Sequence, residues 1–167
     1  MKITILNADI TKLEVDAIVN ASNKWLTRGG GVSGAIHETA GPELEEECSQ
    51  RKHELGIDKI NIGDVVITHG HNLPAKYVFH TVGPVYGSDE VSLLKKCYIN
   101  SLDKADSMNL KTIAFPGIST GVFGVPVEES AKIVSDVLKN YKPMALEEVF
   151  LVFINEKEVE MYKKYVK

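Results

Sequence analysis

The sequence predicts an α/β fold: a three-layer α/β/α sandwich in which helices cover both faces of a mixed, mostly parallel sheet. Short runs rich in Val, Ile and Phe alternate along the chain with longer stretches whose apolar residues fall at helical spacing. Such alternation is typical of repeated strand–helix units. The connections that follow two of the apolar runs are rich in glycine. Open α/β sheets bind ligands at such connections, so these two segments are the candidates for a functional site.

Strands are expected where β-branched and aromatic residues gather, at residues 2–6, 16–19, 64–68, 76–81, 112–115 and 149–153. The first of these alternates apolar and polar residues, whereas the last is continuously apolar and should be covered on both faces. The first two strands are joined by too few residues for a full helix. This short connection favours an antiparallel arrangement in part of the sheet.

Helices are expected at residues 33–54, 91–108, 126–141 and 156–166. Pro42 should divide the first stretch into two helices, because proline breaks a helix interior. The acidic residues at 43 and 45–47 are expected to form a solvated helix face. The helix at 126–141 opens with Pro126 and two glutamates, which suit a helix N-terminus.

The composition predicts one domain over residues 1–167, with 44% apolar and 25% charged residues. The net charge of −4 gives no general attraction for nucleic acid or a membrane surface. Cys48 and Cys97 are expected to be buried free thiols, as in a reducing cytoplasm. The first ten residues show no targeting segment, because Asp9 interrupts their apolar stretch. A monomer is expected. No cofactor is indicated. His69 and His71 have no third ligand nearby, so no metal site is expected.

The first glycine-rich connection reads Asn-Ala-Ser-Asn-Lys-Trp-Leu-Thr-Arg-Gly-Gly-Gly-Val-Ser-Gly over residues 20–34. Glycines directly before a helix let the backbone approach a ligand, and the helix N-terminus would point its amides at an anion. The alternative is a flexible turn. The glycines also match a dinucleotide fingerprint, but they stand well beyond the preceding strand, and no P-loop motif is present. A nicotinamide-dependent oxidoreductase and a P-loop nucleotidase are therefore disfavoured.

The second connection reads Pro-Gly-Ile-Ser-Thr-Gly-Val-Phe-Gly-Val-Pro over residues 116–126 and again stands between a strand and a helix. Its glycines, with Ser119 and Thr120, could form a second amide-rich loop. Two such loops on neighbouring strand ends would suit two linked phosphates. Phe123 could stack on a sugar or a ring. The alternative is a tight turn with a packed Phe.

Together these segments resemble the macro domain family, whose members bind ADP-ribose. The resemblance covers nearly the whole chain and rests on five segments in order, namely residues 7–10, 19–23, 29–37, 77–84 and 113–124. It implies the predicted sandwich fold. It also implies that ADP-ribose, or an ADP-ribosylated protein, is the partner.

The resemblance implies roles for individual residues. Asp9 would accept a hydrogen bond from the adenine amino group, with the Ile10 amide beside it. Asn23 would hold the distal ribose, and Phe123 would cover it. Asn20 also belongs to the predicted ligand-binding set, but it would mainly brace the loop. The residues expected around the diphosphate are Gly30, Gly31, Val32, Ser119, Thr120, Gly121 and Val122. Those expected to form the wall beside adenine are Phe153, Ile154 and Asn155.

Asn23, Ser33 and Phe123 form the predicted catalytic set. Hydrolytic members of the family carry Asp at the position of Ser33, and a serine hydroxyl orients water but cannot act as a general base near neutral pH. Two functions stay open. One is slow hydrolysis of the C1″ ester linkage by a water that the substrate's own phosphate activates, which includes deacylation and dephosphorylation of related ADP-ribose esters. The alternative is a pure ADP-ribose reader with no catalytic activity.

Overall fold

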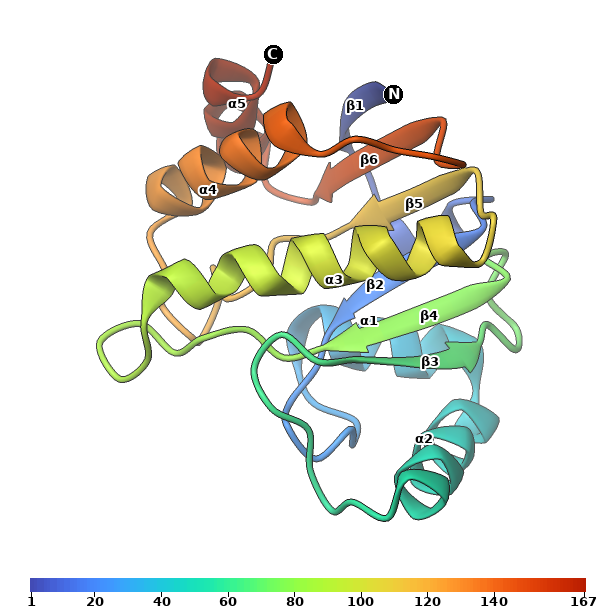
Figure 1. Ribbon diagram of the computed structural model, residues 1–167. Helices are drawn as coiled ribbons and strands as arrows, with labels where there is room; N and C mark the ends of the chain where they lie inside the picture. Colours follow the sequence, from blue (N-terminus) through green and yellow to red (C-terminus); the bar gives the residue numbers. More distant parts are fainter.

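The computed structural model describes residues 1–167 and contains one six-stranded sheet in the order β1-β6-β5-β2-β4-β3 (Figure 1). The strands are β1 (Lys2–Asn7), β2 (Ala17–Ala21), β3 (Val65–His69), β4 (Tyr77–Thr81), β5 (Thr112–Phe115) and β6 (Glu148–Phe153). All neighbouring strands are parallel except β3 and β4. The expected mixed sheet is confirmed. The expected antiparallel part is present but is formed by β3 and β4, whereas β1 and β2, whose short connection suggested it, are not neighbours, because β1 pairs with β6.

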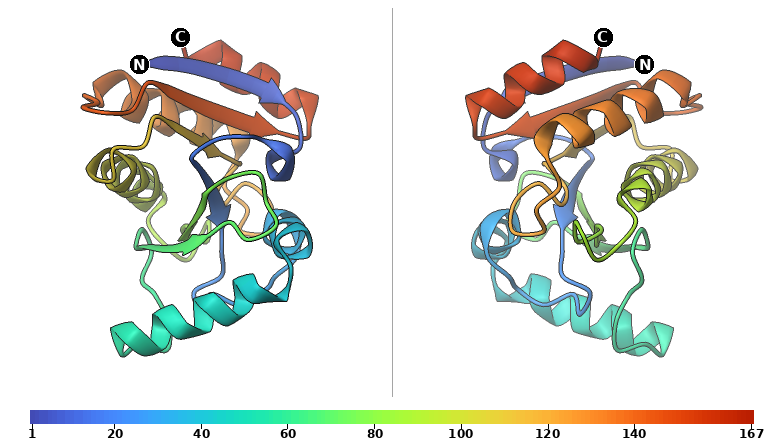
Figure 2. Two further views of the ribbon diagram at one scale, coloured as in Figure 1. Left: turned by 90° about the vertical axis from the view of Figure 1, so that its right-hand side faces the viewer. Right: turned by 90° about the vertical axis from the view of Figure 1, so that its left-hand side faces the viewer.

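Five helices cover the two faces of the sheet, as Figure 2 shows. They are α1 (Gly31–Ala40), α2 (Pro42–Leu55), α3 (Leu94–Ser107), α4 (Val127–Asn140) and α5 (Glu156–Tyr165). The predicted break at Pro42 is confirmed, because α1 ends before Gly41, whose φ of 92° no other residue adopts easily. The helix expected from residue 91 begins with a short 3-10 turn at Val91–Leu93.

The two faces of the sheet bury separate apolar cores. Val19 and Phe79 pack with residues of α3, α4 and α5, while Ile18 and Val78 pack with residues of α1 and α2. This follows from the alternation of side chains along paired strands. Each fully buried apolar side chain contributes about 1.5–3 kcal/mol. The central strands β2 and β5 are thereby fixed on both faces.

A buried polar chain joins β2, β4 and β3. Asn20 Nδ2 lies 3.1 Å from His80 Nδ1, and Thr68 Oγ1 lies 2.9 Å from His80 Nε2. Burial lowers the pKa of His80 to about 3, so the ring is neutral at physiological pH. A neutral imidazole offers one donor and one acceptor, which allows it to connect the two side chains. These hydrogen-bonded side chains secure the end of β2, where the first glycine-rich loop begins.

The acidic stretch of α2 is not wholly solvated. Glu47 is 8% exposed and accepts hydrogen bonds from the His69 amide at 2.9 Å and from Arg51 at 3.0 Å. Its oxygens also lie 3.0 Å from His69 Nδ1 and 2.8 Å from His71 Nε2. Burial raises the pKa of this carboxyl, but these hydrogen bonds outweigh burial and hold the pKa below its ordinary value. The expectation of a solvated face is wrong for Glu47, which ties α2 to the end of β3.

Both cysteines are buried and free, as expected. Burial raises the pKa of Cys48 to about 12 and that of Cys97 to about 11. Neither thiol is ionised at neutral pH, so neither is an activated nucleophile. None of the five helices has the length and hydropathy needed to span a bilayer.

Candidate functional site

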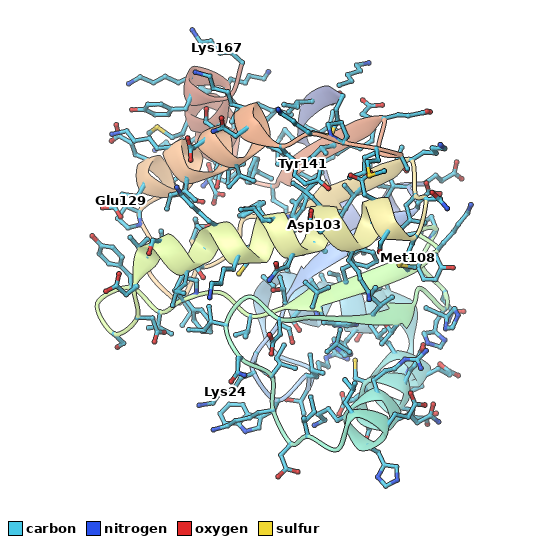
Figure 3. All side chains as sticks on the ribbon, in the orientation of Figure 1. Lys24, Asp103, Met108, Glu129, Tyr141 and Lys167 are labelled. Carbon is cyan, nitrogen blue, oxygen red and sulfur yellow. The ribbon has the colours of Figure 1, made fainter.

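Two loops leave the same edge of the sheet. The first, residues 22–30, follows β2, and the second, residues 116–126, follows β5, which pairs in parallel with β2. The first leads into α1 on one face and the second into α4 on the opposite face. Figure 3 labels Lys24 on the first loop and Glu129 on α4, both toward the end to which the parallel strands point. A crevice is expected where neighbouring strands send their helices to opposite faces.

The first loop presents a row of unpaired backbone amides. The N–H groups of Gly30, Gly31, Val32 and Ser33 have no acceptor within the protein, because they belong to the start of α1. Gly31 has a φ of 55°, a conformation that favours glycine. Gly34 is needed for a different reason, since a Cβ there would lie 2.8 Å from the carbonyl oxygen of Gly29.

The second loop presents another row. The amides of residues 119–123 have no acceptor within the protein. Ser119 has a φ of 64°, and left-handed residues of this kind turn successive amides toward one side, which forms an anion-binding concavity. The Ser119 hydroxyl is buried without a partner. It fits only because residue 83 is glycine, where a Cβ would lie 2.1 Å from Ser119 Oγ.

The two loops meet between two cavities. One, of about 410 Å³, is lined by Asn23, Ser33 and Phe123 among others, and we call it the Ser33 cavity. The second, of about 630 Å³, is lined by Asp9, Ile10 and Phe153 among others, and we call it the Asp9 cavity. Both cavities share the same four loop residues, namely Gly31, Val32, Gly117 and Gly121. The amide rows therefore lie at the junction of one long cleft, whose parts have volumes in the range of ligand pockets.

The Ser33 cavity contains no titratable side chain. Asn23 lines it, but its Nδ2 donates to Thr27 O at 3.0 Å and its Oδ1 accepts from the amides of Trp25 and Thr27 at 3.0 and 3.2 Å. Asn23 thus holds the first loop in shape. The neighbouring Trp25 is 52% exposed, and the buried Leu26 anchors this loop by packing.

Ser33 stands in the first turn of α1 and is 4% exposed. Its Oγ accepts a hydrogen bond from the Gly29 amide at 3.4 Å, which folds the glycine run back onto the helix. The hydroxyl borders the cavity while bracing the loop. Phe123, half-buried, packs against the small apolar cluster that includes Leu26.

The Asp9 cavity combines one free acceptor with an apolar wall. Asp9 Oδ1 accepts from the Thr11 amide at 3.0 Å and from the Thr11 hydroxyl at 2.7 Å, whereas Oδ2 has no partner. The hydroxyl bond, and then the backbone bond, outweigh the effect of burial and lower the pKa of Asp9. The carboxylate is therefore charged at neutral pH. Phe153 is buried and Ile154 is 80% exposed along the wall.

Every predicted site residue but one lines this cleft. The exception is Asn20, which is 0% exposed and bonds to His80 beneath the loop. This contact agrees with the bracing role expected for Asn20, and the buried side chain does not line the cleft. Gly83 and Glu158 were not predicted. Gly83 could have been found, because it lies in residues 77–84, one of the five segments that resemble the macro domain family. Nothing in the sequence distinguishes Glu158 from other helix-surface glutamates.

A hollow of about 640 Å³ also lies between α1 and α2. Its lining has no apolar residue and includes Glu38, Glu45 and Glu46. Nucleotide-sized ligands are held mainly by apolar walls with a few polar groups. The cleft between the two loops meets that description and this hollow does not.

Comparisons with known proteins agree on one family. The sequence profile described as Macro domain matches residues 19–134. A relative named O-acetyl-ADP-ribose deacetylase 1, from Pantoea vagans, is 44% identical over 98% of this chain and 97% of its own length. Another, named ADP-ribose glycohydrolase MACROD1, from Bos taurus, is 43% identical over 98% of this chain and 50% of its own length. A solved macrodomain mutant from Oceanobacillus iheyensis with ADPR has a TM-score of 0.93 and 37% identity, over 96% of this chain and 89% of that chain.

The chain therefore belongs to the macro domain family. Its sheet, with helices on both faces, is the fold of that solved relative. The family resemblance that the sequence indicated is confirmed.

The close approach at Gly34 gives a prediction with a definite sign. Alanine in a helix normally gains up to about 1 kcal/mol over glycine. At residue 34, the new Cβ meets a backbone oxygen at 2.8 Å, and overpacking costs roughly 1–3 kcal/mol. We expect Gly34→Ala to lower the free energy of unfolding, measured by urea denaturation. Gly121→Ala, where nothing lies within 4 Å, is the control and should change little. A more stable Gly34→Ala protein would contradict the close approach.

Proposed function

We propose that this chain binds ADP-ribose and mono-ADP-ribosylated proteins in the cleft, and that it slowly hydrolyses the C1″ ester bond of the distal ribose. The observation that carries the proposal is the pair of unpaired amide rows at the junction of the two cavities. No Lys or Arg lines either cavity. A diphosphate would therefore be bound by backbone amides and by the N-terminus of α1, which suit anions without a charged side chain.

The two sides of the junction suit the two ends of ADP-ribose. On one side, the unpaired Oδ2 of Asp9 would accept a hydrogen bond from the adenine amino group, and Phe153 and Ile154 would supply apolar contact. On the other side, the distal ribose would lie near Asn23 and Phe123. The names of the relatives, a deacetylase and a glycohydrolase, and the ADPR of the solved macrodomain support this ligand.

The chemistry follows from what the Ser33 cavity lacks. Without a carboxylate, imidazole or amine in its lining, the base nearest to a water at C1″ would be a phosphate oxygen of the ligand. Water would attack C1″, the bond from C1″ to the acyl oxygen would break, and the acyl group would leave as a carboxylate. The water's proton would pass to the phosphate oxygen. Turnover would be slow, because a positioned general base contributes about 10²–10⁴-fold.

A reader without turnover is the second candidate. The same absence of a titratable group favours it, as does the engagement of both Asn23 groups and the Ser33 hydroxyl in shaping the loop. Reader and slow enzyme share one binding mode. Only a rate measurement separates them.

Asp9→Asn tests the recognition of adenine. Asparagine keeps an oxygen for the bonds from Thr11 but places an amide group where the free acceptor stands. We expect ADP-ribose affinity to fall about 10- to 100-fold, since a hydrogen bond to a charged group contributes roughly 1.5–3 kcal/mol. Calorimetry measures this, with Asp58→Asn, an exposed carboxylate outside the cleft, as control. Unchanged affinity in Asp9→Asn would reject this role.

Single-turnover release of labelled ADP-ribose from a Glu-linked mono-ADP-ribosylated protein tests the hydrolysis. The parent should release label slowly, and Asn23→Ala should lose most of that rate because the loop is no longer held. Ser33→Asp should be faster than the parent, by up to about 10²-fold, since it adds a general base.

Binding of ADP-ribose is confirmed in each sample before the rates are compared. No release by a parent that binds ADP-ribose would identify a reader. A flat or lower rate in Ser33→Asp would show that water is activated elsewhere.

A further inference from the structure

Glu158 is an unpartnered carboxylate in the wall of the Asp9 cavity. It is half-buried and makes no hydrogen bond or ion pair within the protein. Asn155 caps α5 by accepting from the Lys157 amide at 2.8 Å, and a glutamate three residues after such a cap commonly bonds back to the cap amide. Glu158 does not make that bond. Its side chain turns instead toward the second loop.

The carboxylate faces a small niche beside Gly117. A Cβ at residue 117 would lie 3.1 Å from Glu158 Oε2, 2.6 Å from Thr120 Oγ1 and 3.7 Å from Phe153 Cε1. A Cβ there would clash with the Thr120 hydroxyl, so glycine at 117 is what lets the Thr120 hydroxyl and the Glu158 carboxylate approach this point together. Thr120 Oγ1 also has no hydrogen-bond partner in the protein. The niche thus offers a carboxylate and a hydroxyl beside a ring edge.

Glu158 lacks the donors that a half-buried carboxylate needs. No Lys, Arg or His lies in the cavity lining, and burial alone raises the pKa of this carboxyl. A partly desolvated acceptor without a donor is costly, so a ligand that brings hydroxyl donors would gain from this position. The exposed Glu156, one residue from the same cap, has no such surroundings.

The position of the niche indicates which part of the ligand would meet it. With the diphosphate on the amide rows and the adenine at Asp9, the sugar that joins them must cross the space between Asp9 and the second loop. Glu158 and Thr120 line that space. Dinucleotide sites of other folds place an acidic side chain on the adenosine ribose hydroxyls in the same way, and accommodate a 2′-phosphate with Arg instead.

We propose that Glu158 accepts hydrogen bonds from the 2′- and 3′-hydroxyls of the adenosine ribose and selects ligands whose 2′-hydroxyl is not phosphorylated. This selectivity rests on the proposed ADP-ribose function of the cleft. The carboxylate attracts the diol and repels a 2′-phosphate, whose charge has no cation to neutralise it in the cavity lining. The site is thereby matched to ADP-ribose derived from NAD and not to the phosphorylated form derived from NADP.

Calorimetry with ADP-ribose and 2′-phospho-ADP-ribose tests this selectivity. The parent should bind the phosphorylated ligand at least about 10-fold more weakly, since opposing like charges costs more than 1 kcal/mol. Glu158→Gln should reduce that ratio to below about 3-fold, chiefly because the phosphorylated ligand binds more tightly once the repulsion is removed. Glu156→Gln removes the same charge from the same helix turn outside the cavity, and should keep the parental ratio.

The outcomes separate the two proposals. If the parent binds ADP-ribose but all three proteins show the same ratio, the role of Glu158 is overturned and the proposed function stands. If the parent binds neither ligand, the proposed function fails and the role of Glu158 fails with it.

Discussion

The parallel pairing of β2 with β5 is the constraint on which the site depends. Only two residue pairs, Ala17–Ile113 and Ile18–Ala114, join these strands, and beyond them the two loops depart toward helices on opposite faces. Residues of both amide rows line one shared junction because the strands are parallel and adjacent. Their donors are fixed by the backbone, so a bound diphosphate would need little rearrangement of side chains. Both apolar cores, and the Asn20–His80 contact, hold this edge in place.

The cleft lacks the cationic side chains that commonly bind phosphate, and its Ser33 cavity lacks a titratable group that could activate water. The Ser33 cavity has no titratable side chain, and no Lys or Arg lines either cavity. Backbone amides can bind an anion but cannot accept a proton. They can therefore hold the diphosphate, whereas hydrolysis needs a separate group that accepts the proton of water. The two carboxylates of the cleft, Asp9 and Glu158, both line the Asp9 cavity. Under the proposed binding mode, recognition of adenosine and hydrolysis would take place at opposite ends of one cleft.

The fold and most of the site could be predicted from the sequence because their signals are local. The break at Pro42 follows from proline geometry, and the two loops can be recognised from their many glycines. The bracing role of Asn20 was expected, but whether its side chain also reaches the cleft depends on where the strand ends, which the sequence does not show. Glu47 and Glu158 resemble other helix glutamates in sequence. Their surroundings, the end of β3 and Gly117, come from segments distant along the chain.

The central claim is that a diphosphate is held by backbone amides of both loops. Amide proton and nitrogen resonances during titration with ADP test it most directly, because hydrogen bonding to an anion shifts the donor amide itself. The account predicts large downfield shifts for residues 30–33 and 119–123 together. Shifts absent from both rows, or confined to the hollow between α1 and α2, would contradict it.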